Sequence, residues 1–183
     1  HHLNLWLGWE WSSSYSQSLG ASSSGYSTDL YQYNNLGAGS LPSSVSSGYS
    51  GFQTNSYFGR LNYYYSDKYL LTLTSRYDGS SVFGANNKYA LFPSAALGWV
   101  ASKENFFVNN EGLSKIFSFF KIRGSYGLTG NSPAAYSSLA TVGSYTVDLN
   151  NQIVKGSGVG GAPNPDLRWE KTKQLDLGAD IRM

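Results

Sequence analysis

The chain has 183 residues and a formal net charge of +2 at pH 7, so no strong attraction to nucleic acid or to anionic surfaces is expected. It contains no cysteine, which excludes disulfides and thiol chemistry. Aromatic residues make up 16% of it and charged residues only 13%, a balance that is unusual for a soluble enzyme and typical of a membrane β-barrel. No apolar run approaches the roughly 18 residues that a membrane-spanning helix needs, so strands would have to make any crossing of a membrane.

Six strands are predicted from the alternation of side chains with a period of two residues. They cover residues 2–12, 52–66, 68–78, 89–101, 119–129 and 168–182. In the first strand Leu3, Leu5 and Leu7 alternate with Asn4 and Trp6. Because the chain starts with a strand already under way and stops just after another, we expect it to be an internal piece of a larger protein.

The second and third strands form the clearest element, a hairpin with a two-residue polar turn predicted at Asp67-Lys68. One face of the hairpin is mostly apolar and contains Tyr57, Gly59, Leu61, Tyr63, Tyr65, Tyr69, Leu71, Leu73, Ser75 and Tyr77. The other face carries Arg60, Asn62, Thr72, Thr74, Arg76 and Asp78. Strands of outer-membrane barrels have this pattern, with apolar side chains toward lipid, a polar lumen and an aromatic girdle at the interface. We assign the tyrosines beside the turn, Tyr63, Tyr65 and Tyr69, to the periplasmic girdle.

The later strands repeat the alternation with different clarity. Strand 89–101 has weakly distinct faces, whereas strand 168–182 alternates four aliphatic residues with polar and charged ones. An antiparallel transmembrane β-barrel in the all-β class is therefore the predicted fold, and the six strands are consecutive staves of one barrel domain that spans residues 1–183. The residues assigned to the polar lumen side are Arg60, Arg76, Arg123, Asp176 and Asp180. Pairing with acids of the lumen, or with a segment that fills it, is the expected role of the arginines.

The connections between the predicted strands alternate in length. The turn at Asp67-Lys68 is minimal, and the connection 102–118 is expected to hold one short helical turn. The loops 13–51 and 130–167 are long, the loop 79–88 is intermediate, and a small hairpin is expected around 141–147. Outer-membrane barrels place short turns in the periplasm and long loops outside. By that rule the first two connections face the periplasm and the three loops face outward.

Three blocks of sequence, well separated and in order, carry a family resemblance. They are SYFGRLNYYYSDKYLLTLTSRYDGSSVFG with the following NNKYALFPSAALGWVASKENFF, then FKIRGSYGLTGNS, then NPDLRWEKTKQLDLGADI. These blocks resemble the barrel region of the SusC/RagA family of TonB-dependent outer-membrane transporters. The opening HHLNLWLGWEW is similar to the strand that precedes them in the family, and the loops 13–51 and 133–163 carry no family signature.

The resemblance implies a barrel of 22 strands around an N-terminal plug, in the outer membrane of a Gram-negative, Bacteroidota-like bacterium. It also implies energy input from the TonB–ExbB–ExbD complex through a TonB box, and a SusD-like surface lipoprotein as partner. The substrate would be an oligosaccharide (glycan) or a peptide, and lipid or lipopolysaccharide would surround the barrel. The plug and the TonB box are expected outside this chain. Six strands are too few to close even a barrel of about eight, so this piece alone is not expected to transport anything.

Candidate binding residues are the aromatic side chains in the first strand and the first long loop. Trp6, Tyr26, Tyr31, Tyr33 and Tyr49 could stack on sugars or peptides, although packing of the loop on its neighbours is the commoner use of such rings. No catalytic site, metal site or cofactor is predicted: the sequence lacks a GxSxG elbow, an HExxH helix and a Walker lysine motif. The only histidines, His1 and His2, are adjacent and rarely form a metal site alone.

Three functions follow from these observations. The leading hypothesis is part of an importer that moves its substrate by gated passage, without enzymatic chemistry. A passive porin or an adhesin barrel is an alternative, and a plug with a TonB box would separate it from the first. A soluble β-rich carbohydrate-binding module is a third, because alternation alone does not distinguish a membrane wall from the face of a sandwich.

Overall fold

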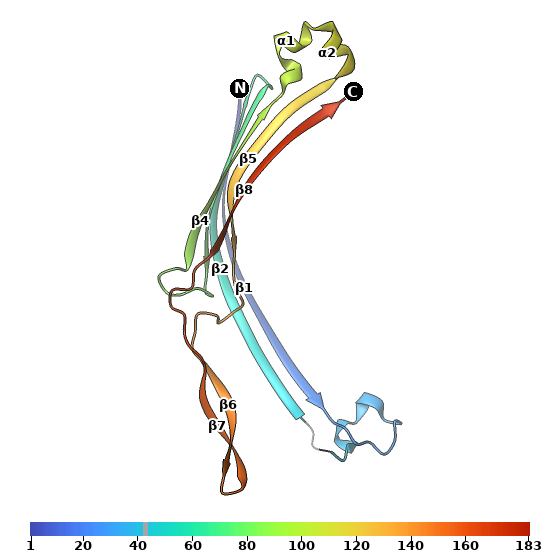
Figure 1. The fold of residues 1–183 in the computed structure, drawn as a ribbon, viewed down its shortest axis with the longest axis vertical. Helices are drawn as coiled ribbons and strands as arrows, with labels where there is room; N and C mark the ends of the chain where they lie inside the picture. The colour runs from blue at the N-terminus through green and yellow to red at the C-terminus, as the bar shows by residue number, and fades with distance from the viewer. Residues whose placement is uncertain (42–43) are drawn as a thin grey trace. The chain divides into compact units, whose positions relative to one another are not determined.

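The computed structural model describes residues 1–41 and 44–183, and most of them lie in long antiparallel strands (Figure 1). The chain divides into two compact units. One consists of Ser13–Phe52, and the other of His1–Ser12 together with Gln53–Met183. The second of these contains most of the sheet and is called the main unit below.

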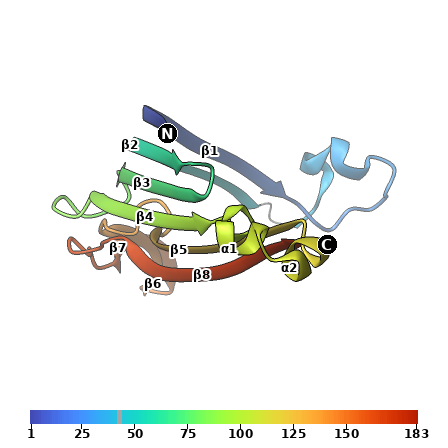
Figure 2. The same cartoon turned by 90° about the horizontal axis from the view of Figure 1, so that it is seen from above.

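All six predicted strands are present, in one sheet with the order β1-β2-β3-β4-β5-β8. Their bounds are β1 His2–Ser22, β2 Ser44–Tyr65, β3 Tyr69–Ser80, β4 Tyr89–Trp99, β5 Phe119–Asn131 and β8 Glu170–Arg182. Figure 2 shows β3, β4, β5 and β8 lying side by side. The strands of the sheet are thus arranged in chain order, as in an up-and-down barrel wall, with β6 (Thr141–Leu149) and β7 (Gln152–Gly161), which lie between β5 and β8 in the chain, set apart.

The first long loop is much shorter than predicted, because β1 and β2 extend into it. Residues 13–22 and 44–51 are strand, so Tyr49 lies in β2 and not in a loop. The loop keeps only residues 23–43, with short 3-10 helices at Gln32–Asn34 and Leu36–Ala38; residues 42 and 43 lie outside the described part of the chain. The prediction failed because Ser and Gly dominate these extensions and hide the alternation of larger side chains such as Tyr15 and Leu19.

The turn between β2 and β3 is centred on Ser66 and Asp67, one residue earlier than predicted. Both residues have positive φ, 50° and 54°, and the Lys68 amide donates to the Tyr65 carbonyl at 3.0 Å. Positive φ at both central residues belongs to the type I′ turn, whose twist matches that of the flanking strands. Tyr65 and Tyr69 are therefore the first paired residues of the hairpin.

The third long loop contains the expected hairpin, but longer than predicted. It consists of β6, Thr141–Leu149, and β7, Gln152–Gly161, which form a separate two-stranded sheet. The connection after β4 is also more helical than expected: it holds a 3-10 turn at Ala101–Lys103, α1 at Asn105–Val108 and α2 at Glu111–Ile116. In the main unit this connection lies at the end of the sheet opposite the β6–β7 hairpin (Figure 1).

The strand register confirms that the sheet has two faces of different chemistry. One row across it joins Leu61, Leu73, Ala95, Tyr126 and Leu175, and the neighbouring row joins Arg60, Thr74, Ser94, Gly127 and Gln174. We call the sides that these rows occupy the apolar face and the polar face. The apolar face is open to the surroundings, with Leu73 43%, Tyr126 51% and Leu175 67% exposed.

Buried apolar side chains of the main unit lie at both ends of the sheet. Val100, Ala101 and Phe107 form a group next to the turn 66–68, and a second group lies at the other end, called the loop end, next to the loop 81–88. Val82 and Phe83, in the loop 81–88, are 3% and 2% exposed, and Phe92 on β4 is 7% exposed. The Trp169 ring packs on both phenylalanines, with ring centroids 4.6 Å from Phe83 and 5.4 Å from Phe92. We call these four residues the loop-end cluster. It fastens the loop 81–88 to the segment that leads into β8.

Candidate functional site: the polar face of the sheet

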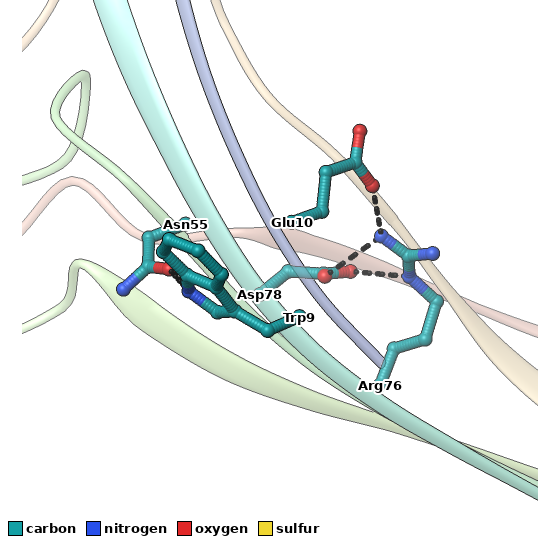
Figure 3. A network of polar contacts seen from close by, with 5 residues as sticks. All are labelled: Trp9, Glu10, Asn55, Arg76 and Asp78. Atoms are coloured by element: carbon teal, nitrogen blue, oxygen red, sulfur yellow. Dashed lines mark hydrogen bonds and ion pairs between the residues drawn. The ribbon is translucent and has the colours of Figure 1, made fainter. Parts of the chain in front are cut away.

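The polar face is organised around Arg76, which comes from the middle of β3. Its guanidinium donates two hydrogen bonds to the Asp78 carboxylate, at 3.2 and 3.3 Å, and lies 3.7 Å from a carboxylate oxygen of Glu10 on β1 (Figure 3). The same guanidinium lies over the ring of Phe58, 5.2 Å from its centroid. One arginine thus links β1, β2 and β3 on this face.

A second group of ion pairs links β5 and β8 on the same face. The Arg123 guanidinium donates to Asp180 at 3.3 Å, and the Lys121 ammonium lies 3.9 Å from the other oxygen of that carboxylate. Farther along β8, Asp176 accepts hydrogen bonds from Ser125 at 3.4 Å and from Gln174 at 3.1 Å. Asp180 is therefore paired with two cations on the adjacent strand, whereas Asp176 is held by hydrogen bonds from uncharged side chains.

Arg60 differs from the other two arginines because no described side chain forms an ion pair with it. It lines a hollow of about 520 Å³ on the polar face. The residues that surround this hollow are Trp6, Phe58, Gly59, Arg60, Asn62, Thr74 and Arg76. Trp6 is 68% exposed there. An open aromatic ring beside a free guanidinium can stack on a sugar or peptide and bind a carboxylate or hydroxyl group.

Five residues were predicted to face the lumen: Arg60, Arg76, Arg123, Asp176 and Asp180. The register places all five on the polar face. Their direction relative to a closed barrel stays a prediction, since six strands do not enclose a lumen.

The five aromatic residues predicted to contact substrate do not form one site within either unit. Trp6 belongs to the main unit, whereas the four tyrosines belong to the unit 13–52. There the Tyr26 hydroxyl donates to the Leu36 carbonyl at 3.3 Å, which fits the packing role. Tyr31, Tyr33 and Tyr49 are 47%, 79% and 63% exposed, so their rings are available to a ligand. Their contact with substrate stays a prediction.

The three girdle tyrosines lie beside the turn, as their sequence positions require. Tyr65 and Tyr69 face each other across the hairpin, with ring centroids 6.1 Å apart, and the Tyr63 hydroxyl is 2.9 Å from Nδ1 of His1. Their membrane-interface role stays a prediction.

A carboxylate that sequence reasoning missed holds the turn to the helical connection. Glu104 accepts hydrogen bonds from the Tyr69 hydroxyl at 2.7 Å, the Lys68 ammonium at 3.0 Å and the Trp99 indole at 3.2 Å. These donors, the hydrogen bond from Tyr69 foremost, lower the pKa of the Glu104 carboxyl to about 2. Nothing in the local sequence marks Glu104, because its partners Lys68 and Tyr69 are more than thirty positions away along the chain.

On the apolar face, Trp9 and Asn55 form a further polar contact. The Trp9 indole donates to the Asn55 side-chain oxygen at 2.6 Å (Figure 3), and the Asn55 amide donates to the Tyr89 hydroxyl at 3.2 Å.

Among residues 1–41 and 44–183, no group of three or more His, Asp or Glu side chains lies close enough together to hold a metal ion. No helix in the described part of the chain is long and apolar enough to cross a membrane.

Comparison with known protein families decides what this two-faced sheet belongs to. Residues 1–182 match the model of the family described as TonB dependent receptor-like, beta-barrel. The chain belongs to the TonB-dependent receptor β-barrel family. Members of this family are outer-membrane proteins, so the antiparallel sheet is part of a barrel wall in the outer membrane. The predicted family, fold class and location are thereby confirmed.

Individual relatives agree with the family assignment. The chain is 39% identical to TonB-dependent receptor P3 of Formosa agariphila over 184 residues, which cover all of this chain and 18% of that protein. It is 38% identical to TonB-dependent receptor SusC of Bacteroides thetaiotaomicron over 131 residues, or 69% of this chain and 13% of that one. The structure of the RagAB peptide transporter matches 98% of this chain and 19% of that one, with a TM-score of 0.79 and 28% identity. The chain thus spans less than a fifth of the length of each relative.

Proposed function

We propose that the chain forms part of the wall of a TonB-dependent importer that takes up oligosaccharides or peptides. The observation that carries this proposal is the sheet with one exposed apolar face and one face of ion pairs, which matches the barrel family over its whole length. In a barrel the apolar face meets lipid and the polar face lines the interior. The ion pairs of Arg76 and Arg123 then link strands of the sheet on the inner side of the barrel.

The hollow beside Arg60 is the place on this wall that best fits contact with a cargo. Arg76 and Arg123 are engaged by carboxylates of the wall, whereas Arg60 has no ion-pair partner among the described residues. A guanidinium on an interior wall attracts a carboxylate, either of the cargo or of a segment that fills the barrel. The importer needs no covalent chemistry here, because gated passage requires binding and release only.

The partners in this proposal come from relatives of the chain. RagAB, which this chain resembles, is a peptide importer. By analogy we propose a SusD-like lipoprotein at the mouth of the barrel, and energy from the TonB–ExbB–ExbD complex acting on a region outside this chain. Peptides and oligosaccharides both remain proposed cargos, since aromatic rings and a guanidinium recognise either.

Uptake by cells tests the proposal. A strain that lacks the native receptor would express the full-length protein that contains this chain, and uptake of labelled oligosaccharides and labelled peptides would be measured with and without TonB. We expect saturable uptake of one class that is lost when TonB is deleted. Uptake that continues unchanged without TonB would contradict the importer and would support a passive porin.

Paired variants connect the activity to this wall. Substituting Trp6→Ala together with Arg60→Ala should raise the concentration needed for half-maximal uptake and leave the amount of receptor in the outer membrane unchanged. Leu97→Ala, on the apolar face, is the matched control because its side chain is 65% exposed and lies away from the hollow. Equal effects of the two changes would show that the hollow takes no part in transport.

A further inference from the structure

The connection between β4 and β5 exposes large apolar side chains at the turn end of the sheet, the end that holds the turn 66–68. Phe106 in α1 is 59% exposed and Ile116 in α2 is 56% exposed, while Phe107 between them is buried, 5% exposed. Figure 1 shows α1 and α2 next to each other beyond the ends of β4 and β5. Exposed side chains of this size, gathered on a short connection, indicate a surface that something covers.

The aromatic residues of this connection continue the apolar face of the sheet. Trp99 belongs to that face, because the register pairs it with Tyr69 and with Ile122. The Phe106 ring lies 6.2 Å from the Trp99 ring, and the Phe107 ring stacks at 6.3 Å on Phe120, which shares the face of Ile122. The connection therefore folds toward the side of the sheet that meets lipid and not toward the polar side.

Glu104 marks the level at which this surface passes from apolar to polar. The rings of Tyr69 and Trp99 lie on the apolar face, whereas the Tyr69 hydroxyl and the Trp99 indole NH both donate to Glu104. Aromatic side chains with an apolar body and a polar tip take this position at a membrane–water boundary. The Phe106 ring, 6.2 Å from the Trp99 ring, lies beside this boundary and is 59% exposed.

The second short helix has two different sides as well. Its first turn is capped by Asn110, whose side-chain oxygen accepts from the amides of Gly112 and Leu113 at 3.1 and 3.2 Å. Glu111 and Lys115 form an i,i+4 ion pair of 3.0 Å on one side. Helical geometry places Leu113 and Ile116 on another side. A helix with charged and apolar sides is suited to lie flat at a bilayer surface.

We propose that residues 101–118 form a membrane-interface anchor in which Phe106 and Ile116 enter the boundary between lipid headgroups and acyl chains. The occupant of this surface is the bilayer leaflet nearest the turn end, because the aromatic contacts join the connection to the lipid-facing sheet without a break. The anchor fixes the height of this part of the barrel in the membrane. It depends on the outer-membrane location and not on what the receptor imports.

Site-directed fluorescence in vesicles tests the anchor. The full-length receptor, with any native cysteine replaced, would carry single substitutions Phe106→Cys or Ile116→Cys labelled with an environment-sensitive fluorophore. This part of the chain has no cysteine of its own. Leu97→Cys, on the exposed apolar face, is the lipid control, and Glu111→Cys, whose side chain is 87% exposed, is the water control. Quenching would be compared for brominated lipids and for aqueous iodide.

We expect the labels at positions 106 and 116 to lose fluorescence with brominated lipid, as at position 97, and the label at 111 to respond to iodide. Iodide quenching at both 106 and 116 without lipid quenching would overturn the proposal. Protection of both positions from both quenchers would also overturn it, because protein and not lipid would then cover the surface. If Phe106→Cys prevents folding, Ile116→Cys decides the question alone.

Discussion

Both ends of the sheet in the main unit bury apolar side chains, but the turn end adds a contact of a different kind, a carboxylate that accepts three hydrogen bonds. At the loop end, Phe83 and its neighbours are removed from solvent, and Trp169 closes over them while its indole donates to the Lys88 carbonyl at 3.0 Å. At the turn end, the carboxylate of Glu104 gathers three donors from the turn and from β4. The stabilisation that buried apolar side chains provide depends little on pH or salt, whereas the stabilisation that a carboxylate provides depends on its ionisation.

The two ends differ because they connect different segments of the chain. The loop end fastens a loop of eight residues to a segment far along the chain, so backbone groups are buried there and paired: the Gly84 amide donates to the Leu167 carbonyl at 3.3 Å. The turn end joins the turn 66–68 to a short helical connection. The carboxylate of Glu104, which belongs to that connection, accepts hydrogen bonds from Lys68 and Tyr69 at the turn. The following changes test whether the two ends respond independently.

The largest effect is expected from Phe83→Ala. Removing a ring that is 2% exposed leaves a cavity against Trp169 and should lower the local free energy of unfolding by about 3–5 kcal/mol. Hydrogen exchange of the full-length receptor in detergent would show it as faster exchange of the Gly84 and Asn164 amides, with the turn end unchanged. Phe106→Ala, at the turn end, is the control; loss of protection at both ends by either change would contradict independent closure.

Gly84→Ala should weaken the loop end by a smaller amount. A Cβ at this buried position would meet the backbone carbonyl of Pro165, which is not free to move like the end of a side chain. The expected cost is about 1–3 kcal/mol, seen as earlier thermal unfolding and faster exchange of the loop 81–88. Gly156→Ala on β7 is the matched control, since its nearest neighbour would lie 3.9 Å from the new Cβ. An equal response to both substitutions would contradict the steric argument.

Glu104→Gln should loosen the turn end alone. The amide keeps the shape of the side chain but loses the charge that pairs with Lys68, so exchange at the turn 66–68 should rise while the loop end keeps its protection. Glu111→Gln removes a carboxylate of an exposed i,i+4 pair and should change little. If the two substitutions had the same effect, Glu104 would be an ordinary surface charge.

Lowering the pH is expected to have the smallest effect on stability, and it tests the ionisation of Glu104 specifically. The pKa of Glu104 is lowered in the fold to about 2, from an ordinary value of 4.5, so its contribution to stability is complete above about pH 4.5 and is lost as the pH falls toward 2. The difference in turn-end exchange between the native receptor and Glu104→Gln should therefore shrink across that window. A difference that persisted unchanged at pH 2 would show that ionisation of Glu104 is not what holds the turn.

Much of the barrel wall was predictable because successive side chains of a strand point to opposite faces of the sheet, so the position of a residue in the strand determines its face. The alternation around Leu61 and Leu73, and that of Leu175 and Leu177, predicted the sheet faces that the register later showed. Where Ser and Gly fill a strand the contrast between faces is lost, which is why the sequence predicts a loop over the end of β1 and the start of β2. The turn was misplaced by one residue because several polar residues in succession allow more than one centre.

Sequence reasoning therefore established a β-barrel wall, its two faces and the family that it resembles, since these depend on local alternation and on short blocks of residues. Only the tertiary structure showed which charges meet. Glu10 and Arg76 are joined across β2, and Trp169 closes over Phe83 from far along the chain. The register and the path of the loops set those contacts, and both depend on how distant segments pack. The hollow beside Arg60, which has no ion-pair partner among the described residues, and the contact of the Phe106 ring with the Trp99 ring became visible for the same reason.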